Sequence, residues 1–239
     1  MPSYEPEFRL KGYEPVNDRV AEQFWQHIEI HETEFTALAQ HHTEDGEHSF
    51  YVMHDRSATW GIPGEPQIVA LHLKREPEAC TFRFDHEVLP LPAMAQSWLI
   101  QRGCPCDTIG INPDLGPPPA DEATRALERR LAGDGDHYAM GYSYTRDYPD
   151  DMVTVVALRA LDERGPSPFR VVVEEVDTDA WTHTLREGGF ATVAEALQWC
   201  DDRLSGTAGP LPPVRPAASP SRPVLPPKAS VPRPPGRSR

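Results

Sequence analysis

The second half of the chain repeats the pattern of the first, and this self-similarity constrains the fold more than any other feature of the sequence. At an offset of 101 to 102 residues, nine identical pairs align, and a few residues must be inserted after the second strand of the later copy. Both halves show the order helix, four strands, helix. We therefore expect a tandem duplication, against the alternative of two unrelated antiparallel layers that each end in a helix with a tryptophan. The pairs are Ala37/Ala139, Thr43/Thr145, Asp45/Asp147, Pro66/Pro168, Ala79/Ala180, Thr81/Thr182, Ala93/Ala194, Ala95/Ala196 and Trp98/Trp199.

In the first half a helical period gives way to a strand period. Asn17 is a suitable N-cap for a helix over 18–30, in which Val20, Phe24 and Ile28 share one face. A period of two starts at Phe35, and residues 43–47 (TEDGE) are typical of a hairpin turn. We expect strands at about 35–40, 48–55, 67–73 and 79–88, followed by a helix over 92–103.

The second half begins after a segment, residues 104–120, that holds two glycines and five prolines. A helix is expected over 120–132, then strands at about 137–146, through Val153 and Val155, at 169–174 and at 180–187. Thr192 and Glu195 form the sequence pattern of a capping box, which predicts the start of a last helix that continues to residue 204.

These patterns predict an α+β protein made of two similar α-β-β-β-β-α units with antiparallel sheets. The expected organisation is an irregular N-terminal arm (1–16), a first unit (17–104), a linker (105–118), a second unit (119–204) and a disordered, basic, proline-rich tail (205–239). Clefts form where units meet, so we expect any site to lie between the two halves.

The tail is marked by an abrupt change in composition. Residues 205–239 hold no acidic residue, eleven of the 27 prolines and six basic residues. The rest of the chain therefore has 17 basic and 37 acidic residues, a net charge of −20. Such a charge repels nucleic-acid phosphates and favours cationic partners.

Other features indicate a cytoplasmic bacterial protein. The first residues lack a basic and then apolar signal pattern, and no stretch is apolar enough to span a membrane. Four cysteines are too few for a disulfide-built fold. Arginine outnumbers lysine 20 to 3, and alanine and proline are plentiful, which indicates a GC-rich bacterial coding sequence.

The tail is the expected partner-binding segment. Three of its stretches read Pro-x-x-Pro-x-basic, a pattern that favours polyproline II and fits aromatic grooves. We expect a protein partner, with weak nucleic-acid binding and contact with the chain's own acidic surface as alternatives. The candidate partner-binding residues are Arg215, Arg222, Lys228, Arg233 and Arg237.

Catalytic candidates are few. Asp85 and Glu87 would share one face of a strand and His86 the other, and these groups can act as acids or bases. Edge-strand charges that prevent aggregation are the structural alternative. The sequence contains no Gly-x-Ser-x-Gly motif, no phosphate-binding glycine loop and no His-Glu-x-x-His motif.

We expect no metal and no cofactor. His27 and His31 have the spacing of a chelating pair on a helix, but no further ligand stands at a recognisable spacing. His41 and His42 would point to opposite faces of a strand. Cys104 and Cys106 flank a proline, and a zinc site would need two more ligands.

The sequence thus favours a non-enzymatic intracellular binding or accessory protein with an acidic body and a basic tethering tail. The alternative is an enzyme, such as a hydrolase, with its site between the two units. A third hypothesis is nucleic-acid association through the tail.

Overall fold

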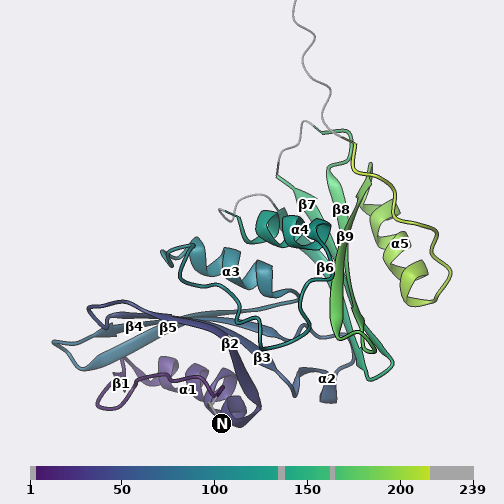
Figure 1. Ribbon diagram of the computed structural model, residues 1–239. Helices are drawn as coiled ribbons and strands as arrows, with labels where there is room; N and C mark the ends of the chain where they lie inside the picture. Colours follow the sequence, from purple (N-terminus) through teal and green to yellow (C-terminus); the bar gives the residue numbers. More distant parts are fainter. Residues whose placement is uncertain (1–3, 134–137, 162–164, 216–239) are drawn as a thin grey trace, which may run out of the picture.

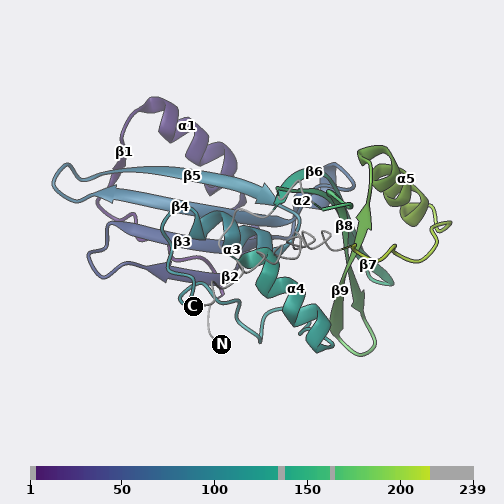
Figure 2. The same cartoon turned by 90° about the horizontal axis from the view of Figure 1, so that it is seen from above.

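The computed structural model describes residues 4–133, 138–161 and 165–215. Within these residues the chain forms two sheets, and helices cover both faces of each sheet (Figure 1). The sheets lie at a steep angle to one another, and two helices occupy the angle between them (Figures 1 and 2).

The first sheet has the strand order β1-β5-β4-β3-β2. Its four long strands are antiparallel neighbours, and the very short β1 adds a parallel edge beside β5. A β-bulge interrupts the pairing of β2 with β3 between Ala37 and Ala39. The strands are β1 (Glu14–Pro15), β2 (Phe35–His42), β3 (His48–Asp55), β4 (Ile68–Glu76) and β5 (Thr81–Leu89).

The second sheet is antiparallel throughout, in the order β6-β7-β8-β9. Its first hairpin also contains a bulge, between Met140 and Tyr142. The strands are β6 (Tyr138–Tyr148), β7 (Asp151–Ala160), β8 (Phe169–Asp177) and β9 (Thr182–Phe190).

Each sheet is packed between two helices (Figure 1). α1 (Asp18–His27) contacts β5 from below the first sheet, and α3 (Pro92–Ile100) covers the opposite face. α4 (Glu122–Ala132) contacts β9 on the face that looks toward α3, and α5 (Val193–Leu204) covers the outer face. A short 3₁₀ helix (Glu29–Glu34) follows α1, and α2 (Ala58–Gly61) lies near β6.

The sheet faces carry four apolar clusters. Phe24 of α1 and Ile28, which directly follows this helix, pack against Tyr51 and Leu71 of the first sheet. Leu99 of α3 packs on the other face of the sheet. The third cluster is shared between the units, because it joins residues at the start of α3 to α4 and to the second sheet. Its members include Leu91, Ala93, Leu127, Leu131, Val156, Leu158, Val172 and Leu185.

The N-terminal arm is attached to the first sheet by a buried arginine. The Arg75 guanidinium donates hydrogen bonds to the carbonyl oxygens of Phe8 and Arg9 and, at 2.9 Å, to Ser49 Oγ. The Tyr51 hydroxyl donates to the Glu7 carbonyl at 2.8 Å. These bonds place Phe8 in the cluster beneath the sheet.

Residues 205–215, which the sequence assigns to the tail, run back along β9. The Gly189 amide donates to the Pro212 carbonyl at 3.0 Å, and Trp199 Nε1 donates to the Gly209 carbonyl at 3.1 Å. Leu211 packs against the apolar cluster under α5. The contacts of the body therefore extend beyond residue 204.

The predicted α+β class with two antiparallel sheets is confirmed, and the predicted helices and strands are present in the predicted order. The capping box is also confirmed, since Thr192 accepts from the Glu195 amide and Glu195 accepts from the Thr192 amide. The sequence did not predict β1, the 3₁₀ helix or α2, because these short elements depend on their tertiary neighbours.

Two backbone features favour the predicted duplication. Cys80 and Trp181, 101 positions apart in the sequence, both have a φ of 51° at the end of the β4–β5 and β8–β9 loops. A bulge also occurs early in β2 and early in β6. The duplication itself stays a prediction.

No helix in the described part of the chain is long and apolar enough to cross a membrane.

Candidate functional site

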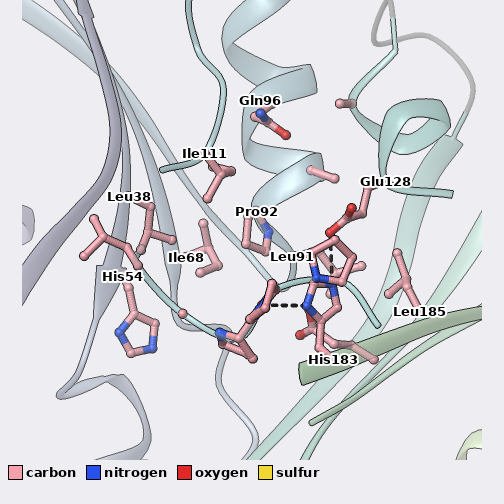
Figure 3. A pocket seen from close by; sticks show the side chains of 18 of the residues that line it. Leu38, His54, Ile68, Leu91, Pro92, Gln96, Ile111, Glu128, His183 and Leu185 are labelled. Atoms are coloured by element: carbon pink, nitrogen blue, oxygen red, sulfur yellow. Dashed lines mark hydrogen bonds and ion pairs between the residues drawn. The ribbon is translucent and has the colours of Figure 1, made fainter. Parts of the chain in front are cut away.

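A cavity of about 780 Å³ lies between the two sheets (Figure 3). The first sheet contributes Leu38, His54 and Ile68 to its wall, and the second contributes His183 and Leu185. α3 and α4 supply further walls, with Gln96 and Glu128 among their lining residues. The proline-rich segment that joins α3 to α4 closes one side. The cavity is thus built by both units and by their connection.

Strand register explains which side chains reach the cavity. Paired residues on neighbouring strands point to the same face of a sheet. Thr36, His54 and Ile68 form one such row in the first sheet. Thr154, Glu174 and Leu185 form another row in the second sheet. The cavity therefore lies between these two cross-strand rows.

The proline run 117–119 is positioned by the start of β9. The His183 amide donates to the Pro118 carbonyl at 3.0 Å, and the Ala120 amide donates to the His183 carbonyl at 2.8 Å. Proline lacks an amide hydrogen and is tolerated where the chain forms an edge. This pairing brings the Pro117 carbonyl to the imidazole of His183.

The ring of His183 is held at both nitrogens. Nδ1 lies 2.8 Å from the Pro117 carbonyl, and Nε2 lies 2.9 Å from Glu128 Oε1 (Figure 3). A carbonyl oxygen can accept but not donate, so Nδ1 carries a hydrogen. When Glu128 is ionised, Nε2 must donate as well, and His183 is then an imidazolium.

The charge of His183 is stabilised by its surroundings. Burial opposes the charge, but the hydrogen bond to Glu128 and the nearby Glu174 carboxylate outweigh it, so the pKa of His183 is raised above its ordinary value. Because both nitrogens are occupied, His183 has no free lone pair for proton abstraction.

Glu174 has a raised pKa and, unlike Glu128, the other acidic group of the cavity, forms no hydrogen bond among the described residues. Burial raises its pKa, the charge of Glu128 raises it further, and His183 partly opposes the shift. In residues 4–133, 138–161 and 165–215, the Glu174 carboxyl has neither a hydrogen-bond partner nor an ion pair. Its neighbours in the row are Thr154 and Leu185.

The wall that the first sheet contributes has fewer charged side chains. Burial lowers the pKa of His54, although Asp147 and Gln67 partly offset this effect. Gln67 Nε2 donates to Asp147 Oδ2 at 2.8 Å, which links the first sheet to β6. Gln96 Nε2 donates to the Ile109 carbonyl at 2.8 Å and so holds the connecting segment against α3.

Two arginines of α4 line the outer part of the cavity. Arg125 Nη1 lies 3.8 Å from Glu122 Oε2, and Arg129 Nη2 lies 2.5 Å from Glu122 Oε1. The Arg125 side chain is half-exposed, and the Arg129 side chain is largely exposed. Their charge is therefore shared with Glu122 and screened by solvent.

The catalytic candidates from the sequence lie away from this cavity. On β5, Asp85 forms an ion pair with Lys74 at 3.0 Å, and Glu87 is exposed beside a smaller hollow of about 330 Å³. His86 points to the opposite face, where its ring centroid lies 4.6 Å from that of His27. The structure does not bring the three side chains together, and their catalytic role stays a prediction.

Of the candidate partner-binding residues, Arg215 is exposed at the end of the described segment. Arg222, Lys228, Arg233 and Arg237 lie outside the described residues.

The histidine pair of the first helix is split between two elements. α1 ends at His27, and His31 lies in the following 3₁₀ helix, where its Nδ1 is 3.5 Å from Ser57 Oγ. No group of three or more histidine, cysteine, aspartate or glutamate side chains in the described part of the chain is arranged to hold a metal ion.

Each histidine of the hairpin has a different neighbour. His41 stacks on Phe50, and His42 Nδ1 lies 2.7 Å from Ser49 Oγ. His48 Nδ1 lies 3.0 Å from His72 Nε2. The two neighbouring cysteines also differ: burial raises the pKa of Cys104 to about 11, whereas Cys106 is exposed at the cavity.

Sequence reasoning missed His54, Glu128, Glu174 and His183. One signal was present: Glu174 follows Val171, Val172 and Val173 in a strand that helices cover on both faces. An acidic side chain there must face a polar space or carry a cost of burial. The pairing of Glu128 with His183 crosses 55 residues and leaves no local pattern.

Comparisons of the chain with protein-family models, with curated proteins and with solved structures gave no significant match.

Proposed function

We propose that this protein binds a small organic molecule in the cavity between its two sheets. The observation that carries the proposal is the cavity itself, with a volume of about 780 Å³. Sites for small ligands typically measure roughly 300–1,000 Å³ and combine apolar walls with a few polar groups. The cavity has this composition, because aliphatic side chains and prolines surround a small set of titratable groups.

The position of the cavity also supports binding. Its walls come from both sheets and from the segment between them. Ligands commonly bind where two units of a fold meet, since such places are concave. The proposal keeps the class of binding protein that the sequence favours and replaces the expected protein partner with a small molecule.

A second candidate is an enzyme that uses the same cavity. The observation in its favour is Glu174, because burial raises the pKa of this carboxyl, and such a group can act as a general acid. His183 does not complete such a site, because Pro117 and Glu128 occupy both of its nitrogens. We therefore place binding first.

The tail hypotheses remain predictions. Protein binding, weak nucleic-acid association and contact with the acidic body all depend on cations that, apart from Arg215, lie outside the described residues.

A cavity-filling substitution tests the proposal. Ala132 lines the cavity near the end of α4, and Ala126 is exposed on the same helix. A fragment library is screened against the full chain by ligand-observed NMR, and the hits are titrated against the Ala132→Phe and Ala126→Phe variants. Hits should lose about tenfold or more in affinity for Ala132→Phe and keep their affinity for Ala126→Phe, because only the first ring occupies the cavity.

Thermal unfolding of both variants shows that each is folded before the titration. A screen without hits, or hits that bind both variants equally, would overturn the proposal.

A further inference from the structure

One part of the cavity contains more carboxyl groups than imidazole groups to pair with them. Glu128, Glu174 and His183 all line it, so two carboxyl groups accompany one imidazole. Glu128 Oε1 is 2.9 Å from His183 Nε2, so the Glu128 carboxyl group already has a partner. Glu174 forms no hydrogen bond or ion pair in the part of the chain that the structure describes, although the nearby His183 partly offsets the rise of its pKa.

No cationic side chain of the described residues forms an ion pair with Glu174. From α4, the lining groups are Glu128, Arg125 and Arg129, and both arginines are bound to Glu122 on the solvent side. From β9, the only charged lining group is His183. The connecting segment contributes no charged residue to the lining, and the first sheet contributes His54, whose pKa is lowered by burial.

Burial makes the ionised form of Glu174 costly and raises its pKa. A ligand cation that pairs with the carboxylate offsets this cost and favours the ionised form. Charge-assisted hydrogen bonds between an ammonium group and a carboxylate are stronger than neutral ones. The rest of the cavity offers apolar contacts, among them Leu38, Ile68, Ile111 and Leu185.

We propose that the cavity selects molecules that carry a protonated amine on an apolar body, with the amine bound to Glu174. This inference rests on the proposed function, because it names the class of ligand that the same cavity takes. The apolar body lies between the two sheets, and the ammonium group faces the row formed by Thr154 and Glu174. The net charge of −20 on residues 1–204 also favours the approach of cations.

Three probes with the same ring system and different charges test the inference. 1-Naphthylmethylamine, 1-naphthylmethanol and 1-naphthoate are titrated into the full chain by calorimetry at neutral pH. The amine should bind about tenfold or more tightly than the alcohol, because one charge-assisted hydrogen bond adds roughly this factor. The carboxylate should bind most weakly.

The variants Glu174→Gln and Glu175→Gln separate the site from the general charge of the protein. Glu175 is the next residue, is exposed, and forms an ion pair with Arg203 on the other face of the sheet. Glu174→Gln keeps the shape of the side chain and should remove the preference for the amine while the affinity for the alcohol is unchanged. Glu175→Gln should leave the preference intact.

The results also distinguish the two proposals. If the amine and the alcohol bind equally and Ala132→Phe weakens both, the cavity binds ligands but the amine inference is wrong. Tightest binding of the carboxylate, or an equal loss in both glutamine variants, would also overturn the inference. A complete absence of binding overturns the inference, and the fragment screen then decides the proposed function on its own.

Discussion

At the scale of single residues, His72 shows how the fold constrains protonation. It is 1 % exposed, its ring stacks on Phe50 with centroids 4.3 Å apart, and its Nε2 lies 3.0 Å from His48 Nδ1. Its Nδ1 is buried without a hydrogen-bond partner in the described part of the chain. Burial, assisted by the charges of Lys74 and His48, lowers the pKa of His72 from 6.5 to about 4.

The lowered pKa of His72 predicts a loss of stability in mild acid. Below pH 6.5 the unfolded chain takes up a proton at this position, whereas the folded protein does not until the pH approaches 4. The stabilising effect is therefore present above pH 6.5 and is lost as the pH falls toward 4, by at most about 3 kcal/mol. His72→Phe keeps the aromatic contact and removes the titration.

Urea unfolding between pH 7.5 and 4.5 checks this prediction. The wild-type protein should lose more free energy of unfolding over this range than His72→Phe does. Parallel curves for the two proteins would show that His72 is not kept neutral in the folded state.

At the scale of elements, local patterns were sufficient to predict the hairpins and the capped helix. The turn at residues 43–47 and the Thr192/Glu195 pair act within a few residues, so their chemistry is readable from the sequence alone. Local patterns did not explain the two adjacent glycines of β9, Gly188 and Gly189, because the residues that pack against them lie elsewhere in the chain. A Cβ on Gly188 would meet Leu211 Cδ2 at 2.6 Å, and one on Gly189 would meet Val214 Cα at 2.9 Å.

Gly189→Ala should therefore displace residues 209–215 from β9. The added methyl group conflicts with backbone as well as with Ser167, so the segment must move and the Gly189–Pro212 hydrogen bond is lost. We expect a loss of about 1–3 kcal/mol in stability and faster proteolytic cleavage after residue 208. Gly209→Ala is the matched control, because no atom lies within 4 Å of the place that its added methyl group would occupy. Equal cleavage rates in both variants would contradict this account of the glycines.

At the scale of the whole molecule, the sequence predicted two antiparallel sheets with helices. Its expectation of a site between the two halves stays a prediction, and a cavity lies at that place. The sequence did not predict the residues of that cavity, because their positions depend on how the sheets are arranged. That arrangement follows from the shared cluster, in which Leu91 and Ala93 pack against Leu127, Val156 and Leu185. None of these contacts is local in the sequence, so periodicity could not reveal them.

The shared cluster predicts that the two sheets unfold together. Ile28 is fully buried beneath the first sheet and belongs to a cluster that contains no residue of the second unit. Ile28→Ala should cost about 2–5 kcal/mol. Unfolding of the first sheet exposes the apolar surface around Leu91, so we expect the second sheet to unfold with it. In Ile28→Ala, the slowest-exchanging amides of β3 and of β8 should therefore lose the same free energy of protection against hydrogen exchange.

Leu91→Ala is the companion variant, since Leu91 is 1 % exposed and lies in the shared cluster itself. It should lower the protection of β3 and β8 equally as well, by a similar amount. If Ile28→Ala weakens β3 and leaves β8 unchanged, the units unfold independently. A cavity between independently unfolding units would change shape as they move, so this measurement also decides whether the ligand site is a fixed part of the fold.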